Sequence, residues 1–180
     1  PPPTGACVYV ANHMSYLDVF VLTALLPADV AYVAKRELRT HWWSRLPLAR
    51  LGTVFVERFD PEKSAADSRQ AVAALRAGQS LVIFPEGTFR RAPGLLPFRM
   101  GAFVAAAEAG VPVVPIALRG TRSMMRGDGW FPRRGEATMV VEEPLRADGD
   151  GWAEALALRD ATRVAILRHC GEPDAAGEVG

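Results

Sequence analysis

The sequence predicts an α/β fold with a mixed, mainly parallel sheet flanked by helices. Short apolar runs of strand length recur along the chain, and segments with helical spacing of apolar residues separate them. Alternation at this short spacing is typical of strands that lie in one sheet beneath covering helices. The expected strands are residues 7–11, 30–34, 52–56, 80–84, 111–118 and 138–141.

Helices are expected where apolar residues recur at helical spacing and where proline or glycine marks an end. Ser15 is the expected N-cap of the first helix, and residues 119–136 are expected to form a basic, glycine-rich loop. Pro112 and Pro115 argue against a central, fully hydrogen-bonded position for the fifth strand. The expected helices are residues 19–26, 61–77, 98–109 and 152–170.

Length and composition place the chain among folded globular proteins. It has 180 residues, of which 49% are hydrophobic and 23% charged, which suffices for one domain with a sizeable core. The net charge of +1 is too small to attract a polyanion such as a nucleic acid through the overall electrostatic field, so we expect no nucleic-acid partner. No apolar run reaches the length of a membrane span. We expect a single domain over residues 1–171 and a frayed tail at 172–180.

The two cysteines and the first residues give further expectations. Cys7 and Cys170 are too few for a disulfide framework, and no zinc spacing is present, so we expect buried thiols or a reducing compartment, and no metal. The chain begins with three prolines, without a methionine or signal peptide. This start indicates a piece of a longer protein whose N-terminal membrane-associating region lies outside it.

The junction between the first strand and the first helix holds the best candidates for chemistry. His13 and Asp18 lie about 140° apart on a regular helix, so they can meet only if His13 lies in the turn before it. Asp18 would then fix the tautomer of His13 and leave the second ring nitrogen free to take a proton from a hydroxyl. As an isolated pattern, a capping serine beside a structural histidine explains these residues better, so the remaining motifs decide.

Other candidate residues also follow strand ends. Loops at the carboxyl ends of parallel strands meet at one rim, so topology predicts that Arg58, Glu86 and Gly87 join His13 and Asp18 in one site. The guanidinium of Arg58 suits capture of a phosphate, although a surface salt bridge explains it equally.

Two further segments leave two interpretations open. Gly87 and Thr88 either offer exposed N–H groups to a polar ligand or form an ordinary turn. Trp42 and Trp43, among leucines and arginines, fit either a segment that dips into lipid headgroups or a core helix with snorkelling arginines. No Gly-x-Ser-x-Gly elbow or Walker pattern is present. The simplest mechanism is therefore a direct transfer in which the acceptor's own hydroxyl is the nucleophile and a histidine is the general base.

Taken together, four blocks resemble the motifs of the glycerolipid acyltransferase family, the lysophosphatidic acid acyltransferases and their relatives. They occur in the family's order across roughly residues 7–145. Phe89 is a departure, since it is inserted before Arg90 in the third block. The blocks are His-x-x-x-x-Asp (His13 to Asp18), Gly-x-x-Phe-[Ile/Val]-[Asp/Glu]-Arg (Gly52 to Arg58), Phe-Pro-Glu-Gly-Thr-Arg (Phe84 to Thr88, then Arg90) and Val-Pro-x-x-Pro (Val111 to Pro115).

The resemblance implies a glycerol-3-phosphate acyltransferase-like fold and an O-acyl transfer at the cytoplasmic face of a membrane. The donor would be acyl-CoA or acyl carrier protein, with no further cofactor. The acceptor would be a lysophospholipid, first of all 1-acyl-glycerol-3-phosphate, and the product phosphatidic acid. The alternatives are another acceptor, such as glycerol-3-phosphate, an ornithine lipid or another lysophospholipid, or a non-catalytic lipid-binding domain of a larger fusion protein.

The resemblance also implies roles for single residues. His13 would be the general base and Asp18 its orienting partner. The acceptor's phosphate and glycerol would be held by Arg58 and by Glu86 with the adjoining Gly87 and Thr88. The remaining implied residues are Lys35, as a further phosphate contact, and Pro115, in the block associated with the acyl donor.

Overall fold

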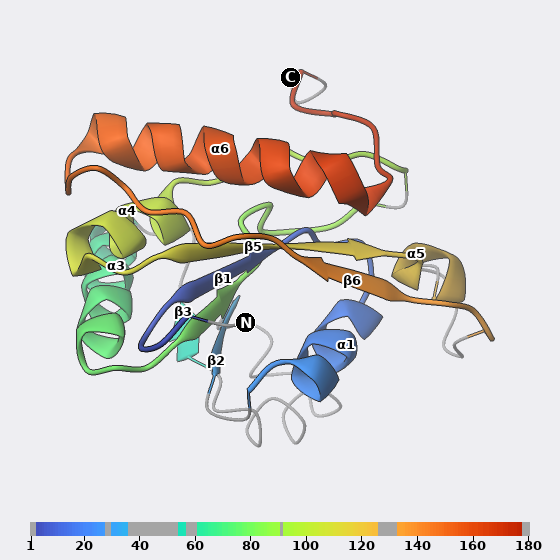
Figure 1. The fold of residues 1–180 in the computed structure, drawn as a ribbon, viewed down its shortest axis with the longest axis horizontal. Coiled ribbons are helices and arrows are strands. Elements are labelled where there is room, and N and C mark those ends of the chain that lie inside the picture. The colour runs from blue at the N-terminus through green and yellow to red at the C-terminus, as the bar shows by residue number, and fades with distance from the viewer. Residues whose placement is uncertain are drawn as a thin grey trace.

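The computed structural model describes residues 3–27, 30–35, 54–56, 61–90, 92–125 and 133–177, and it places a sheet between two layers of helices (Figure 1). Its strands are β1 (Val8–Ala11), β2 (Ala31–Lys35), β3 (Val54–Val56), β4 (Leu81–Ile83), β5 (Val113–Arg119) and β6 (Thr138–Val141). Its helices are α1 (Leu17–Leu25), α3 (Pro61–Arg76), α4 (Gly101–Ala109), α5 (Thr121–Met124) and α6 (Trp152–Cys170).

The sheet has the strand order β3-β2-β4-β1-β5-β6 in the described part of the chain. β1 pairs in parallel with β4 and β5, and β2 pairs in parallel with β3 and β4. Only the pairing of β5 with β6 is antiparallel. The predicted mixed, mainly parallel sheet is therefore confirmed, and the carboxyl ends of β1 to β5 lie at one edge.

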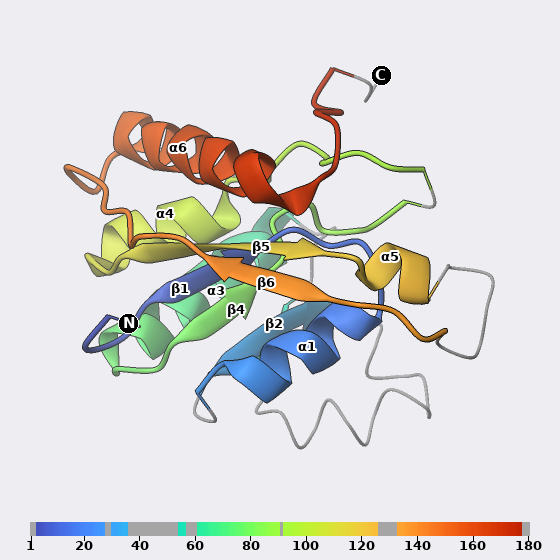
Figure 2. The ribbon, with the colours of Figure 1, turned by 45° about the vertical axis from the view of Figure 1, so that its right-hand side comes forward.

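Both faces of the sheet are buried, which explains the continuous apolar runs of its strands. Successive side chains point to opposite faces: Val8 and Val10 join the core beneath α3, α4 and α6, while Tyr9 joins the core beneath α1. Phe103 of α4 and Leu22 of α1 are fully buried against these two faces. Figure 2 shows α1 on one side of the sheet, with α4 and α6 on the other.

The ends of two helices differ from the expectation. α1 begins at Leu17 with Tyr16 at its N-cap, so Ser15 as N-cap was wrong. α4 begins at Gly101 rather than at residue 98. The N–H of Arg99 donates to the carbonyl of Pro85 at 2.9 Å. Because this hydrogen bond holds the segment before α4 outside a helix, α4 starts later than expected.

The expected 119–136 loop was wrong at its start, where Thr121–Met124 form the short helix α5. The expected non-central position of the fifth strand was also wrong, because β5 lies between β1 and β6. Pro115 is tolerated there because the pairing with β6 ends beside it. Its carbonyl accepts the N–H of Glu142, the residue after β6, at 3.0 Å.

The expected frayed tail at 172–180 was wrong as far as residue 177. Glu172 accepts the backbone N–H of Gly94. The N–H of Ala175 donates to the carbonyl of Leu95 at 3.1 Å, and the Ala175 side chain is 3% exposed. The segment after α6 is thus packed against the loop that precedes α4, and it contributes to the position of that loop.

The thiols of Cys7 and Cys170 are both buried, as expected. None of the helices in the described ranges is long and apolar enough to cross a bilayer.

Candidate active site

Three neighbouring strands deliver the candidate site to the carboxyl edge of the sheet. β1 ends just before Asn12 and His13, β4 leads into Glu86, and β5 ends just before Gly120 and Thr121. Since β4, β1 and β5 are adjacent, their loops meet there. The predicted convergence of His13, Asp18 and Glu86 is confirmed.

Asp18 is the centre of the hydrogen bonding in this site, and its side chain is fully buried. Its Oδ2 lies 2.9 Å from Nδ1 of His13 and accepts the backbone N–H groups of Met14, at 2.6 Å, and Ser15, at 2.8 Å. Its Oδ1 accepts the hydroxyl of Thr121. The carboxylate therefore bends the turn before α1 back on itself and brings His13 to Asp18, although the two residues lie on different faces of a regular helix.

The contacts of Asp18 determine the tautomer of His13. A carboxylate only accepts hydrogen bonds, so Nδ1 carries the proton and Nε2, on the far side of the ring, is the basic nitrogen. The imidazole side chain is 15% exposed, which leaves it accessible at its edge.

Two phenylalanines hold the imidazole ring. Phe84 stacks on His13 with a centroid separation of 4.2 Å and an interplanar angle of 23°. Phe89 meets the ring edge-on at 4.7 Å, and Tyr16 in turn meets Phe89 at 4.9 Å. The residue that departs from the third family block is therefore in direct contact with the candidate base.

Glu86 binds the backbone of the turn that follows β1, and its side chain is buried, with 5% exposed. Its Oε1 accepts the backbone N–H of His13 at 2.7 Å, and its Oε2 accepts that of Leu96 at 2.9 Å. Both oxygens are directed at the backbone, so Glu86 ties the loop after β1 to the loop before α4. Burial raises the pKa of Glu86 from 4.5 to about 7; the two backbone N–H groups oppose this shift, and the charge of Asp18 adds to it.

This raised pKa makes the stability of the fold depend on pH. Between about pH 4.5 and about pH 7 the unfolded chain releases the Glu86 proton while the folded chain keeps it, so stability falls as pH rises through that window. We expect the free energy of unfolding of the wild type, relative to the non-titrating Glu86→Gln variant, to fall by up to about 3 kcal/mol across it. Urea denaturation at several pH values measures this difference, and a difference that stays constant would contradict the assignment.

Asn12 fixes the start of the same turn and is fully buried. Its amide Nδ2 donates to the carbonyl of Leu118 at 3.0 Å, and its Oδ1 accepts the N–H of Leu118 at 2.7 Å. The side chain thus extends the pairing of β1 with β5 by one step beyond Ala11, which holds the residue before His13 against a buried strand.

Three other predicted residues, Gly87, Thr88 and Pro115, also lie in the described part of the chain. Gly87 adopts a φ of 74° and donates its N–H to the carbonyl of Phe84 at 3.1 Å, so it forms a turn. Thr88 is exposed beyond that turn. Pro115 is buried inside β5, opposite Val10, and lies away from the rim.

The two predicted phosphate contacts are only partly placed. The backbone of Lys35 ends β2 at the same edge of the sheet as His13, and its side chain is outside the described residues. Arg58 and the Trp42–Trp43 segment also lie outside the described residues. β3, which precedes Arg58 in sequence, ends at Val56 beside the end of β2.

Sequence reasoning missed Thr121 as a partner of Asp18. The signal was present, because Thr121 follows the end of a strand as His13 and Glu86 do. It was overlooked because no motif covers it and the segment was expected to be loop.

Within the described ranges, no group of three or more His, Cys, Asp or Glu side chains could hold a metal ion.

Comparisons with known proteins agree with this geometry. A family model described as Acyltransferase matches residues 2–119. The chain is 32% identical over 146 residues to 1-acyl-sn-glycerol-3-phosphate acyltransferase BAT2, chloroplastic, of Brassica napus, covering 81% of this chain and 42% of that protein. It is 31% identical over 172 residues to 1-acyl-sn-glycerol-3-phosphate acyltransferase alpha of Mus musculus, covering 92% of this chain and 59% of that protein.

A solved structure has the same fold. The crystal structure of the 1-acyl-sn-glycerophosphate (LPA) acyltransferase PlsC from Thermotoga maritima is similar with a TM-score of 0.76 and 26% sequence identity, over 93% of this chain and 66% of that one. The resemblance inferred from the four blocks is thereby confirmed. The chain spans about half the length of the two curated relatives, at 42% and 59% of them.

Proposed function

The chain belongs to the acyltransferase family, and on that premise we propose that it transfers an acyl group from an acyl thioester to the free hydroxyl of 1-acyl-glycerol-3-phosphate. The product is phosphatidic acid, and the donor is acyl-CoA or acyl carrier protein. The observation that carries the proposal is the imidazole of His13, accessible at its edge and held at Nδ1 by a fully buried carboxylate.

The reaction proceeds by direct attack. Nε2 of His13 takes the proton of the acceptor hydroxyl while the oxygen forms a bond to the thioester carbonyl carbon. Asp18 stabilises the imidazolium that results. Collapse of the tetrahedral intermediate breaks the carbon–sulfur bond, and the leaving thiolate takes the proton back from His13 as free thiol. A thioester is already activated, so no covalent acyl-enzyme is needed.

The acceptor is held from the side of β2 and β3. Lys35 and Arg58 bind its phosphate, and the Gly87–Thr88 segment borders its glycerol; the parallel order of β2, β3 and β4 at one edge supports this assignment. Glu86 is a positioning residue, since both of its oxygens hold backbone groups. Because the acceptor is a lipid, the reaction takes place at a membrane surface, which we assign to the cytoplasmic face.

The proposal is tested by assaying the chain with an acyl-CoA and a panel of acceptors: 1-acyl-glycerol-3-phosphate, glycerol-3-phosphate, an ornithine lipid precursor and lysophosphatidylcholine. We expect free thiol and diacyl product in equal amounts, with the highest kcat/KM for 1-acyl-glycerol-3-phosphate. Preference for another acceptor would overturn the assigned substrate. Binding to liposomes without product from any acceptor would identify a lipid-binding domain instead.

A further inference from the structure

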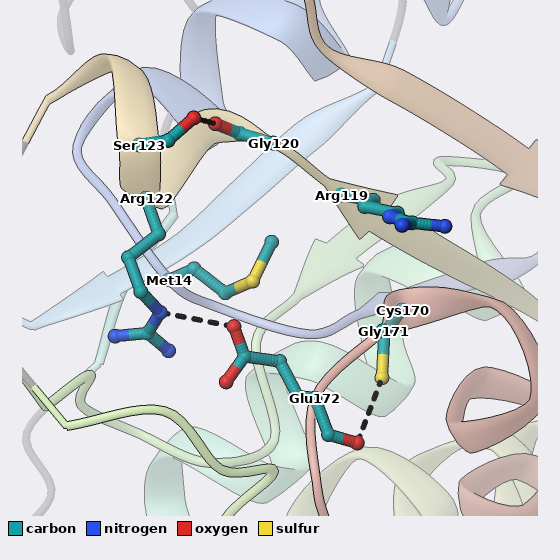
Figure 3. A pocket seen from close by; sticks show the side chains of 8 residues that line it. All are labelled: Met14, Arg119, Gly120, Arg122, Ser123, Cys170, Gly171 and Glu172. Atoms are coloured by element: carbon teal, nitrogen blue, oxygen red, sulfur yellow. Dashed lines mark hydrogen bonds and ion pairs between the residues drawn. The ribbon is translucent and has the colours of Figure 1, made fainter.

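A cavity of about 300 Å³ adjoins the candidate active site on the side away from β2 and β3. Met14, the residue after His13, lines it together with Arg119, Arg122 and Glu172 (Figure 3). We call it the inner hollow. It lies between the turn before α1, the turn after β5 and the end of α6, so it leads directly to the turn that carries the base.

A second cavity of about 420 Å³ lies beside the first, and Arg119 and Gly120 line both. This outer hollow is bordered by Thr138 of β6 and by Arg168 in the last turn of α6. Arg119 therefore borders both hollows.

The cations of these hollows differ in their partners. Arg122 forms an ion pair with Glu172, with Nε 2.9 Å from Oε1, and Figure 3 shows Arg119 pointing away from this pair. Within the part of the chain that the structure describes, neither Arg119 nor Arg168 has a carboxylate within ion-pair distance. Glu136 is the acidic residue of the outer hollow, so two unpaired guanidinium groups face one carboxylate.

Arg119 is also held in place by the backbone. Gly171, which ends α6 with a φ of 70°, packs against it so closely that an added Cβ would come within 3.2 Å of Arg119 Nε. The positive φ favours a glycine there, and the contact places the Arg119 side chain against the end of α6. The negative end of the α6 dipole favours a cation at this position without neutralising it by a carboxylate. Arg119 is thus oriented and still available to an anion.

We propose that the two hollows bind the phosphate-bearing arm of the acyl donor, with Arg119 and Arg168 at its phosphate groups. The inference rests on the proposed acyl transfer. The ligand chemistry is that of a phosphopantetheine thioester, which acyl-CoA and acyl carrier protein share. Guanidinium groups bind phosphate oxygens through paired N–H donors, and Lys35 and Arg58 are assigned to the acceptor across β4 and β1. In this arrangement the two substrates approach His13 from opposite sides, and the hydroxyl and the thioester meet beside it.

The donor site is tested with the variants Arg119→Ala and Arg168→Ala. We expect each to raise KM for acyl-CoA roughly tenfold, the loss of about one charge-assisted hydrogen bond, with kcat and KM for the acceptor unchanged. The variants and the wild type should use acyl-pantetheine, which lacks phosphate, equally well. Arg159→Ala is the matched control, because Arg159 lies on α6, lines neither hollow and pairs with Asp160 at 2.7 Å.

Acyl-phosphopantetheine separates the two sources of phosphate. If the effect of Arg119→Ala persists with it, the arginine binds the phosphate common to both donors; if the effect occurs only with acyl-CoA, it binds the nucleotide end. An unchanged KM for both phosphorylated donors would overturn the proposal.

A binding measurement keeps this result independent of the proposed function. Calorimetry with CoA should show Arg119→Ala about tenfold weaker than the wild type, while His13→Ala binds CoA normally. Equal binding of CoA by the wild type and Arg119→Ala would overturn the donor site alone. Arg119-dependent binding without any acyl transfer would overturn the proposed function and not the site.

Discussion

The variant His13→Ala is expected to lose at least about a thousandfold in kcat, measured as thiol release from an acyl-CoA in the presence of 1-acyl-glycerol-3-phosphate. The loss follows from the geometry, because Nε2 of His13 is the basic nitrogen at the rim and Asp18 holds the ring by Nδ1. General-base catalysis contributes factors of about 10² to 10⁴, and alignment of the ring by Phe84 and Phe89 adds to the effect.

The same assay should be repeated with His13→Gln, which keeps a polar side chain of similar length but provides no base. Both variants should retain the circular dichroism spectrum of the wild type, since the imidazole is not part of either hydrophobic core. Turnover at the wild-type rate in both folded variants would remove His13 from the mechanism.

The second large effect is expected for Asp18→Asn. The carboxylate accepts hydrogen bonds from His13, Met14, Ser15 and Thr121, and an amide replaces one of its acceptor oxygens with a donor. With its nitrogen at the Oδ2 position, the amide would set donor against donor at Met14 and Ser15 inside a fully buried site. With its nitrogen at the Oδ1 position, the Thr121 hydroxyl can turn to accept it, but the charge that stabilises the imidazolium is lost in either case. We expect kcat to fall by about 10³, with the free energy of unfolding lower by about 1–3 kcal/mol.

Thr121→Val provides the graded comparison, because it removes only the hydroxyl that Oδ1 of Asp18 accepts. It should lower kcat by no more than about tenfold. A positioning function for Asp18 predicts that kcat falls while KM for donor and acceptor stays within about twofold. A rise in both KM values with kcat preserved would instead assign Asp18 to substrate binding.

Much of the fold was predictable because its strands carry local signals. Buried parallel strands are continuous apolar runs; β1 and β4 lie within the runs that the sequence marks, and β5 extends beyond its run by one residue, Arg119. The convergence of His13 and Glu86 followed from the rule that loops after parallel strands share one edge. The turn before α1 also had to place His13 outside the helix, and the hydrogen bond to Asp18 confirms that requirement.

The errors concern contacts between segments that are distant in sequence. The packing of residues after α6 depends on Glu172 and Gly94, which are 78 positions apart, so no local pattern reveals it. The late start of α4 likewise depends on Pro85, which binds the N–H of Arg99. Ser15 is of a residue type that is favoured at N-caps, but its hydroxyl donates to the carbonyl of Met125, which is 110 positions away. Tertiary contacts of this kind override local propensity.

The Asn12 side chain has a consequence for the proposed reaction. Its side-chain amide donates to the carbonyl of Leu118 and accepts the N–H of Leu118, so it binds both backbone groups of that residue just beyond the pairing of β1 with β5. The peptide preceding the imidazole is consequently immobilised in the free protein. No loop at this position has to become ordered when lipid and thioester arrive, so the entropy of that ordering is not subtracted from their affinity.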